Sequence, residues 1–146
     1  MSATSPPEAV FRHAFTVPES ALDENGHVNN VVYVQWMQDA AVAHSDSTGG
    51  TRAARDSGGT WVVRSHAVEY LRPAYAGDPV EARTWVEDIQ RIRSTRRYEF
   101  VRTSDDTLLA RGSTQWVFVD AATGRPRSIP PEVRECYVPL ESPSKF

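Results

Sequence analysis

Four polar residues that could act together on a carbonyl group precede the most apolar stretch of this chain: Asp23, Asn25, His27 and Asn30. An aspartate carboxylate can serve as a nucleophile or as a general base. The first N–H groups of a helix lack intrahelical acceptors and lie at its positive end, so they can stabilise a developing oxyanion. If a helix begins at Asn30, the amides of residues 30–32 follow Asp23 closely enough to reach the same carbonyl group.

The same stretch also has a purely structural interpretation. Asp23 followed by the Asn25-Gly26 pair is typical of an Asx-type turn. Asn30, with Asn29 as the alternative, is a good helix N-cap residue, and a cap can still present a useful amide. The histidine beside the turn is also compatible with a surface or capping position, so chemistry and local structure remain alternatives here.

The element that must position these residues is a helix over residues 30–46, which would be about 25 Å long at about 1.5 Å per residue. It is apolar nearly all the way round, and Gly49-Gly50 would end it. A helix of this composition is usually buried on most sides. Because the chain has no second helix of comparable length, we expect a sheet to surround it.

The rest of the chain supplies candidate strands. A short helical or loop piece is predicted at 51–57, and the alternation of residue types and the turn signals predict strands over 11–17, 61–71, 80–89, 94–103 and 107–119. Ala110 and Gly112 are small residues among large ones in the last strand, which indicates close approach by the helix. The predicted fold class is α+β, with an antiparallel sheet around one long helix.

Composition sets the broad class. With 146 residues and 40% hydrophobic residues, the chain fits one globular domain. We expect a disordered tail over 1–9, the domain over 10–135 and an irregular, proline-rich tail over 136–146.

The net charge of −3 argues against nucleic-acid binding. The scattered histidines and single cysteine, Cys136, predict no metal site and no disulfide. No apolar run is long enough for a membrane helix, and the first ten residues lack the features of a signal peptide. The expected location is the cytoplasm.

Residues 23–36, DENGHVNNVVYVQW, resemble the start of the central helix in hotdog-fold acyl thioesterases. These include the single-domain acyl-CoA type, similar to 4-hydroxybenzoyl-CoA thioesterase, and the plant acyl-ACP type. Residues 68–73 with Gly77-Asp78, and residues 116–120, also look like this family, so the resemblance covers about residues 10–135. It implies a hotdog fold, in which a five-stranded antiparallel sheet wraps the long helix.

The resemblance also implies roles for individual residues. Asp23 would be the nucleophile or general base, and a backbone amide near Asn30 would be the oxyanion donor. Asp23, Asn25 and His27 match the plant Asp-x-Asn-x-His set, although a glutamate that those enzymes use has no counterpart near Pro73. Four helix residues would help to shape the acyl site: Val31, Val32, Tyr33 and Trp36. Other hotdog thioesterases use an acid on the helix, for which Asp39 is the second candidate.

An arginine cluster could bind phosphate. Arg91, Arg93, Arg96 and Arg97 fall within seven residues between the third and fourth predicted strands. Guanidinium groups suit phosphates, so Arg93, Arg96 and Arg97 are candidate contacts for coenzyme A or a phosphopantetheine-bearing carrier protein. A solvated hairpin or an ion-paired subunit contact is the alternative.

The expected activity is hydrolysis of an acyl-CoA or acyl-carrier-protein thioester without a cofactor. A hotdog dehydratase or hydratase is one alternative, but the tight Asn25-x-His27 spacing favours hydrolysis. A non-catalytic acyl-thioester binder is another. The family resemblance, together with an exposed sheet edge, predicts a homodimer or a tetramer of two dimers, with the acyl site between subunits.

Overall fold

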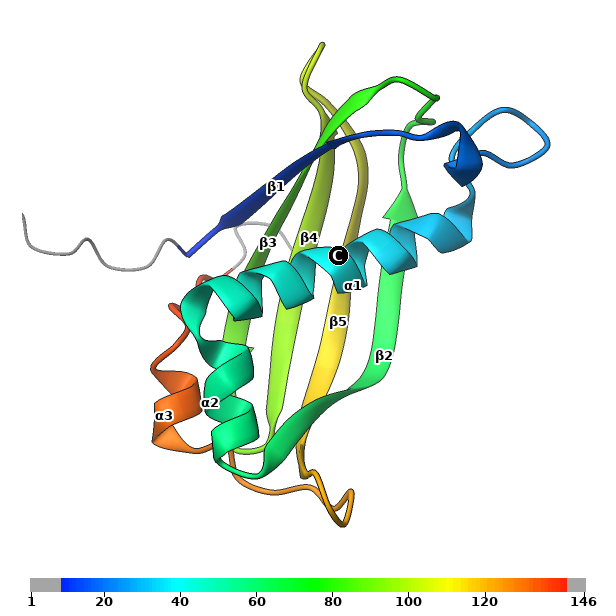
Figure 1. The fold of residues 1–146 in the computed structure, drawn as a ribbon. Helices are drawn as coiled ribbons and strands as arrows, with labels where there is room; N and C mark the ends of the chain where they lie inside the picture. Colours follow the sequence, from blue (N-terminus) through cyan, green and yellow to red (C-terminus); the bar gives the residue numbers. More distant parts are fainter. Residues whose placement is uncertain (1–8, 142–146) are drawn as a thin grey trace, which may run out of the picture.

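An antiparallel sheet curves around helix α1, which lies across one of its faces (Figure 1). The computed structural model describes residues 9–141, so nearly all of the predicted tail over 1–9 and the last part of the tail over 136–146 lie outside the described residues. The elements, in chain order, are β1 (Phe11–Thr16), a short 3-10 turn η1 (Glu19–Ala21), α1 (Asn30–Thr48), α2 (Gly50–Asp56), β2 (Gly59–Tyr70), β3 (Pro79–Ile89), β4 (Arg93–Arg102), β5 (Thr107–Asp120) and α3 (Pro131–Arg134).

The five predicted strands all form, and they make one sheet in the order β1-β3-β4-β5-β2. All neighbouring pairs are antiparallel. β2 stands at one end of the sheet and pairs only with β5, so its outer edge has no partner within the described residues. Most of its side chains are exposed as well, in contrast to those of β3, β4 and β5.

Capping residues define both ends of helix α1. Asn29 is the N-cap: its side-chain oxygen accepts a hydrogen bond from the N–H of Val31 at 3.0 Å. The preferred prediction of Asn30 as the cap is therefore wrong, and its alternative is correct. At the other end, Gly49 takes a left-handed conformation with φ of 85°, which favours glycine.

The small residues of β5 let α1 approach the sheet, as predicted. A side chain at Gly112 would meet the carbonyl oxygen of Ala67 at 2.9 Å and the sulfur of Met37 at 3.1 Å. Met37 and Ala40 on α1 are fully buried against this face, as is Ala110 of β5. The helix and the sheet are thus closely packed at Ala110 and Gly112, where larger side chains would not fit.

The C-terminal segment packs against the domain instead of running over its surface. Ile129, Val133 and Tyr137 recur every four residues and are buried in a second apolar cluster beneath α2. The N–H of Leu140 also donates to the carbonyl of Val86 on β3 at 2.8 Å. The domain therefore continues beyond the predicted boundary at residue 135, because the prolines stop regular pairing without keeping apolar side chains out of the core. Within residues 9–141, no helix has the length and apolar character to span a membrane.

Candidate functional site

The carboxylate of Asp23 closes the loop before α1. Its Oδ1 accepts hydrogen bonds from the backbone N–H groups of Asn25 at 2.9 Å and His27 at 3.3 Å. The backbone N–H of Asp23 in turn donates to the carbonyl of His27 at 2.7 Å. The predicted Asx-type turn thus forms, and it uses only one carboxylate oxygen. Within residues 9–141, Oδ2 of Asp23 has no hydrogen-bond partner, so it remains available to a substrate or water.

The side chains of Asn25 and His27 do not bond to this carboxylate in the described part of the chain. The His27 ring packs edge-on against Tyr75, with ring centroids 5.5 Å apart, and the Asn25 side chain is exposed. The structure therefore brings Asp23, Asn25 and His27 into one loop. Their link is through backbone amides and not through a relay of side chains.

Among the described residues, one of the three predicted helix amides has no acceptor. The N–H of Val31 donates to the side-chain oxygen of Asn29 at 3.0 Å, and the N–H of Val32 donates to the backbone carbonyl of Asn29 at 2.9 Å. The N–H of Asn30 has no acceptor among the described residues, while its carbonyl accepts from the Tyr70 hydroxyl at 2.9 Å. Asp23 and Asn29 share a shallow surface depression. The oxyanion donor that this helix start can offer is therefore the amide of Asn30.

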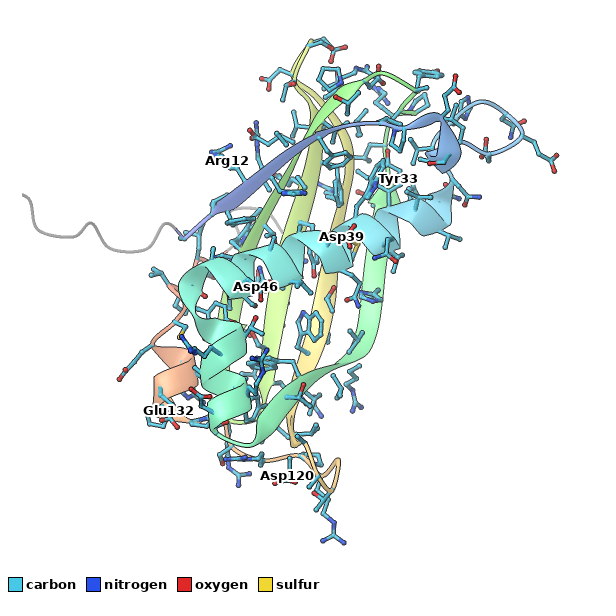
Figure 2. All side chains as sticks on the ribbon, viewed as in Figure 1. Arg12, Tyr33, Asp39, Asp46, Asp120 and Glu132 are labelled. Atoms are coloured by element: carbon cyan, nitrogen blue, oxygen red, sulfur yellow. The ribbon has the colours of Figure 1, made fainter. Side chains whose placement is uncertain are left out.

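The helix residues predicted to shape an acyl site differ in position. Figure 2 places Tyr33 near the start of α1 and Asp39 about halfway along it. Tyr33 is buried in the aromatic core with Trp36, and burial raises the pKa of Tyr33 to about 12. Val31 is 73% exposed and Val32 is half-buried. The second candidate acid, Asp39, is exposed and accepts from the Gln35 side chain at 2.9 Å.

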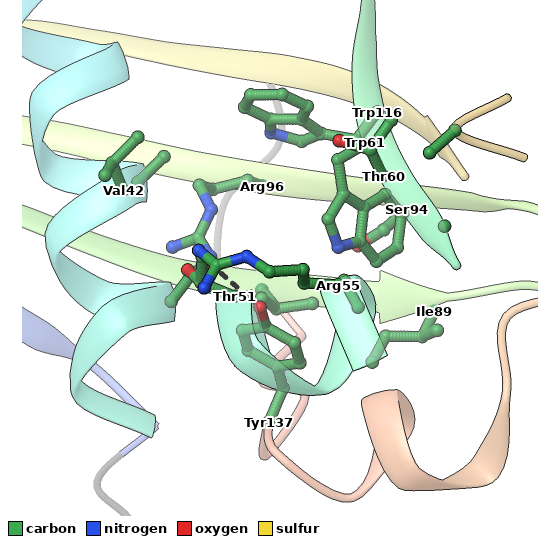
Figure 3. Close-up of a pocket in the computed structure, with 16 residues that line it drawn as sticks. Val42, Thr51, Arg55, Thr60, Trp61, Ile89, Ser94, Arg96, Trp116 and Tyr137 are labelled. Carbon is green, nitrogen blue, oxygen red and sulfur yellow. Dashed lines mark hydrogen bonds between the residues drawn. The ribbon is translucent and has the colours of Figure 1, made fainter. Parts of the chain in front are cut away.

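The best-formed pocket lies at the opposite end of α1. It has a volume of about 470 Å³ and is enclosed by the second half of α1, by α2, by strands β2 to β5 and by the C-terminal segment. Figure 3 shows Trp61, Arg96, Trp116 and Tyr137 around this common space. None of the helix residues predicted for the acyl site lines it.

Sequence reasoning missed most of this pocket because its walls come from two helices, four strands and the C-terminal segment. One signal was present. In β4, Arg96 has the same parity as Tyr98 and Phe100, so strand alternation places it on the buried face. The same alternation shows that the predicted arginine cluster is not one continuous surface.

Arg96 and Arg97 point to opposite faces of the sheet: Arg96 is buried, and Arg97 pairs with Glu87 through Nε at 3.1 Å. Arg91 and Arg93 are exposed near the hairpin. The four guanidinium groups therefore do not form one surface for phosphate, and Arg96 alone lines the pocket.

Arg96 is held by two neutral partners. Its Nη1 donates to Nδ1 of His44 at 2.8 Å and to Oγ1 of Thr84 at 3.1 Å. Burial, with Arg96 as a second cause, lowers the pKa of His44 to about 4, so the imidazole is neutral at pH 7. The described residues contain no group of three His, Cys, Asp or Glu side chains that could hold a metal ion.

Comparison with known proteins agrees with this architecture. The chain is 25% identical over 138 residues to the acyl-[acyl-carrier-protein] hydrolase FATB3, chloroplastic, of Cuphea viscosissima, which covers 88% of this chain and 33% of that protein. It is 27% identical over 143 residues to the palmitoyl-acyl carrier protein thioesterase, chloroplastic, of Cuphea hookeriana, covering 92% and 34%. The chain therefore spans about a third of the length of these curated relatives.

The fold is shared with solved structures. Slr0204, a 1,4-dihydroxy-2-naphthoyl-CoA thioesterase from Synechocystis, matches with a TM-score of 0.78 at 18% identity, covering 87% of this chain and 94% of that one. This likeness confirms the hotdog fold. The sequence profile of the thioesterase-like superfamily matches residues 17–136. Because that match covers most of the sequence, the chain belongs to the thioesterase-like superfamily.

Proposed function

We propose that this protein hydrolyses acyl thioesters of coenzyme A or of a carrier protein to the free acid and thiol, without a metal or redox cofactor. The observation that carries the proposal is the superfamily match over residues 17–136. Its support within the chain is the loop that leads into α1, where one carboxylate oxygen of Asp23 and the N–H of Asn30 have no hydrogen-bond partner among residues 9–141.

The chemistry follows from these two groups. As a general base, Asp23 takes a proton from water, and the resulting hydroxide attacks the thioester carbonyl carbon. The amide of Asn30 stabilises the oxyanion that forms. The C–S bond then breaks, and the thiolate leaves and takes up a proton. As a nucleophile, Asp23 would instead form an acyl anhydride that water hydrolyses. The Asn25 side chain faces solvent and the His27 ring packs against Tyr75, so neither side chain blocks the approach of a substrate to the Asp23 carboxylate.

The position of the pocket supports a site built by two copies of the chain. The Asp23 loop and the pocket lie at opposite ends of α1, whose 19 residues extend about 28 Å at about 1.5 Å per residue. One end of β2, at Tyr70, is bonded to the start of α1, and the other end, at Gly59, lines the pocket. If two copies pair antiparallel through β2, the Asp23 loop of one copy comes beside the pocket of the other.

The surface of β2 suits such pairing. An unpaired edge is a template for another strand, and proteins normally protect it by charge, by bulges or by a partner. Large apolar side chains are exposed on β2 and on the adjoining face of α1: Val31, Val42, Val62, Val63 and Tyr70. We therefore propose a homodimer joined through β2, with a tetramer of two dimers as an extension of the same proposal.

The hydratase or dehydratase alternative has less support. That chemistry uses a histidine together with an acid, and the His27 ring forms no hydrogen bond to a carboxylate within residues 9–141. It packs edge-on against the Tyr75 ring instead. Hydrolysis through Asp23 requires no such pair.

The test is release of free thiol from a panel of acyl-CoA and acyl-carrier-protein substrates by the parent protein and by Asp23→Asn. Asparagine retains the Oδ1 that accepts from the loop amides, so the loop should keep its shape. We expect a loss of at least about 100-fold in kcat/KM, which is about 2.7 kcal/mol.

Asp39→Asn is the matched control because it makes the same chemical change on the exposed side of α1. It should retain parental activity. Full activity in Asp23→Asn, combined with loss of activity in Asp39→Asn, would assign the catalytic role to Asp39 instead of Asp23. A parent that releases no thiol from either class of substrate would overturn the hydrolase proposal.

A further inference from the structure

The pocket contains a buried cation with no anionic partner. The Arg96 side chain enters from β4, and the residue is only 4% exposed. Its two hydrogen bonds both leave from Nη1, to His44 and Thr84. The N–H groups of Nε and Nη2 have no acceptor among residues 9–141. A buried charge normally has an ion-pair partner, because the loss of hydration is otherwise uncompensated.

The surroundings of Arg96 contain no counterion. None of the sixteen described residues that line the pocket is an aspartate or a glutamate. Asp46 lies nearby on α1, but its carboxylate accepts from the Thr51 hydroxyl at 2.7 Å and forms no ion pair with Arg96 in this part of the chain. His44 is neutral at pH 7. The only other cation on the pocket wall, Arg55, is exposed, so it adds positive charge at the rim.

A second donor in the same wall lacks an acceptor. Nε1 of Trp116 is buried and makes no hydrogen bond of normal geometry within the described residues. It lies close enough to the Tyr98 hydroxyl to influence its pKa, but it does not complete a bond to it. Because this nitrogen is enclosed by protein, the donor that a ligand in the pocket can reach is the Arg96 guanidinium.

The remaining wall is mainly apolar or aromatic, with Val86, Ile89 and Trp61 among its members. We propose that this pocket binds a molecule with an apolar body that ends in a carboxylate, which pairs with the free edge of the Arg96 guanidinium. That this molecule is the acyl group of the substrate rests on the proposed hydrolase function; the carboxylate site itself does not.

A carboxylate suits the site better than a phosphate. One fully buried guanidinium balances one negative charge and can meet two carboxylate oxygens in a plane. A phosphate monoester carries up to two negative charges, and the buried guanidinium balances only one of them, because Arg55 is exposed to solvent. The predicted preference is therefore for an acyl chain or ring with a terminal carboxylate over the same group without it.

Two probes that differ only in this group test the proposal: monomethyl suberate and methyl octanoate, with binding measured by quenching of tryptophan fluorescence in the full-length protein at pH 7. Their ester ends imitate a thioester that has no coenzyme. We expect the parent to bind monomethyl suberate at least about tenfold more tightly, and Arg96→Met to remove that preference. Inorganic phosphate at the same concentration should not displace the acid.

Arg125→Met is the matched control, since it removes the same charge from an exposed turn outside the pocket. Its preference for the acid should equal that of the parent. Arg96→Lys keeps the positive charge and loses the planar pair of donors, so it should reduce the preference without abolishing it. If Arg96→Met fails to fold, Arg96→Lys and the parent still decide between the outcomes.

Equal binding of the two probes by the parent would overturn the proposal, as would an undiminished preference in folded Arg96→Met or displacement by phosphate. These results are separable from the hydrolase test. A protein that prefers the acid but releases no thiol retains the carboxylate site and loses the proposed function. A protein that releases thiol without any preference retains the function and loses the site.

Discussion

The guanidinium of Arg96 donates a hydrogen bond to Nδ1 of His44 at 2.8 Å, joining the middle of the sheet to the second half of α1. For Nδ1 to accept this bond, the imidazole must carry its hydrogen on Nε2. Phe11 stacks on the same ring at 5.2 Å between centroids. A neutral histidine therefore holds the buried cation of the pocket in place.

This contact predicts a pH dependence of stability. The pKa of His44 is lowered from 6.5 to about 4 in the folded protein, so between these values the unfolded chain binds more protons than the folded one. The contribution of His44 to the free energy of unfolding should be fully present above about pH 6.5. It should be lost as the pH falls toward 4, by at most about 3 kcal/mol. Urea unfolding of the parent and of His44→Asn at pH 7 and pH 5 measures it.

The His44→Asn variant should lose less stability than the parent between these two pH values, because asparagine keeps an acceptor but cannot take up the proton. His13→Asn, which changes an exposed histidine on β1, serves as the control and should follow the parent. Identical pH profiles for the parent and His44→Asn would contradict the assignment.

The close approach at Gly112 predicts a cost for a single methyl group. In Gly112→Ala the new carbon would meet the carbonyl oxygen of Ala67 at 2.9 Å, and this backbone atom cannot turn away. We expect a loss of about 1–3 kcal/mol in the free energy of unfolding, measured in urea. Ser113→Ala, on the next and less buried position of β5, should change stability by less than about 0.5 kcal/mol. A fully stable Gly112→Ala would show that the backbone of β2 at Ala67 and the Met37 side chain can move away from β5 without cost.

The hydrogen bond between the Tyr137 hydroxyl and Oγ of Ser45, 2.8 Å long, ties the C-terminal segment to α1 beside the pocket. Tyr137→Phe and Ser45→Ala should each destabilise the protein by about 1 kcal/mol. The double variant should lose less than the sum, with a coupling of about 1 kcal/mol in a double-mutant cycle. Strict additivity would mean that the two groups do not interact in solution.

A two-copy site predicts complementation between inactive variants. Asp23→Asn removes the carboxylate proposed as base or nucleophile, and Thr51→Trp fills the pocket from α2. If each site uses Asp23 of one copy and the pocket of the other, random exchange of subunits should restore about a quarter of parental thiol release. Both variants alone should remain inactive in the same assay.

Sedimentation velocity of the parent, of each variant and of the mixture gives the oligomeric state, and recovery of one untagged variant with its affinity-tagged partner shows that subunits exchange. Val63→Lys places a charge on the free edge of β2 and should shift the parent toward monomer. Restored activity in a mixture that is wholly monomeric would contradict a shared site, and so would no restoration in a mixture that forms mixed dimers.

Local signals in the sequence were sufficient for the elements and for the loop at the start of α1. Strand alternation, the turn residues and Gly49 each act within a few positions, so they predict β1 to β5 and the end of α1 closely. The Asp23 turn is equally local, because its hydrogen bonds join residues two and four positions apart. The choice between Asn29 and Asn30 as cap was not decided by residue type, since both are asparagine and only backbone geometry distinguishes them.

Only the tertiary structure decided which side chains enclose the pocket. Arg96 meets His44 across 52 positions, and Tyr137 meets Ser45 across 92. Such pairs depend on how the sheet curves around α1 and on where the proline-rich segment returns to it, and no local pattern encodes either. The sequence by itself determined the loop that carries the proposed acid, because that loop is stabilised by its own backbone. The buried cation became visible only when long-range packing removed Arg96 from solvent and from the other arginines.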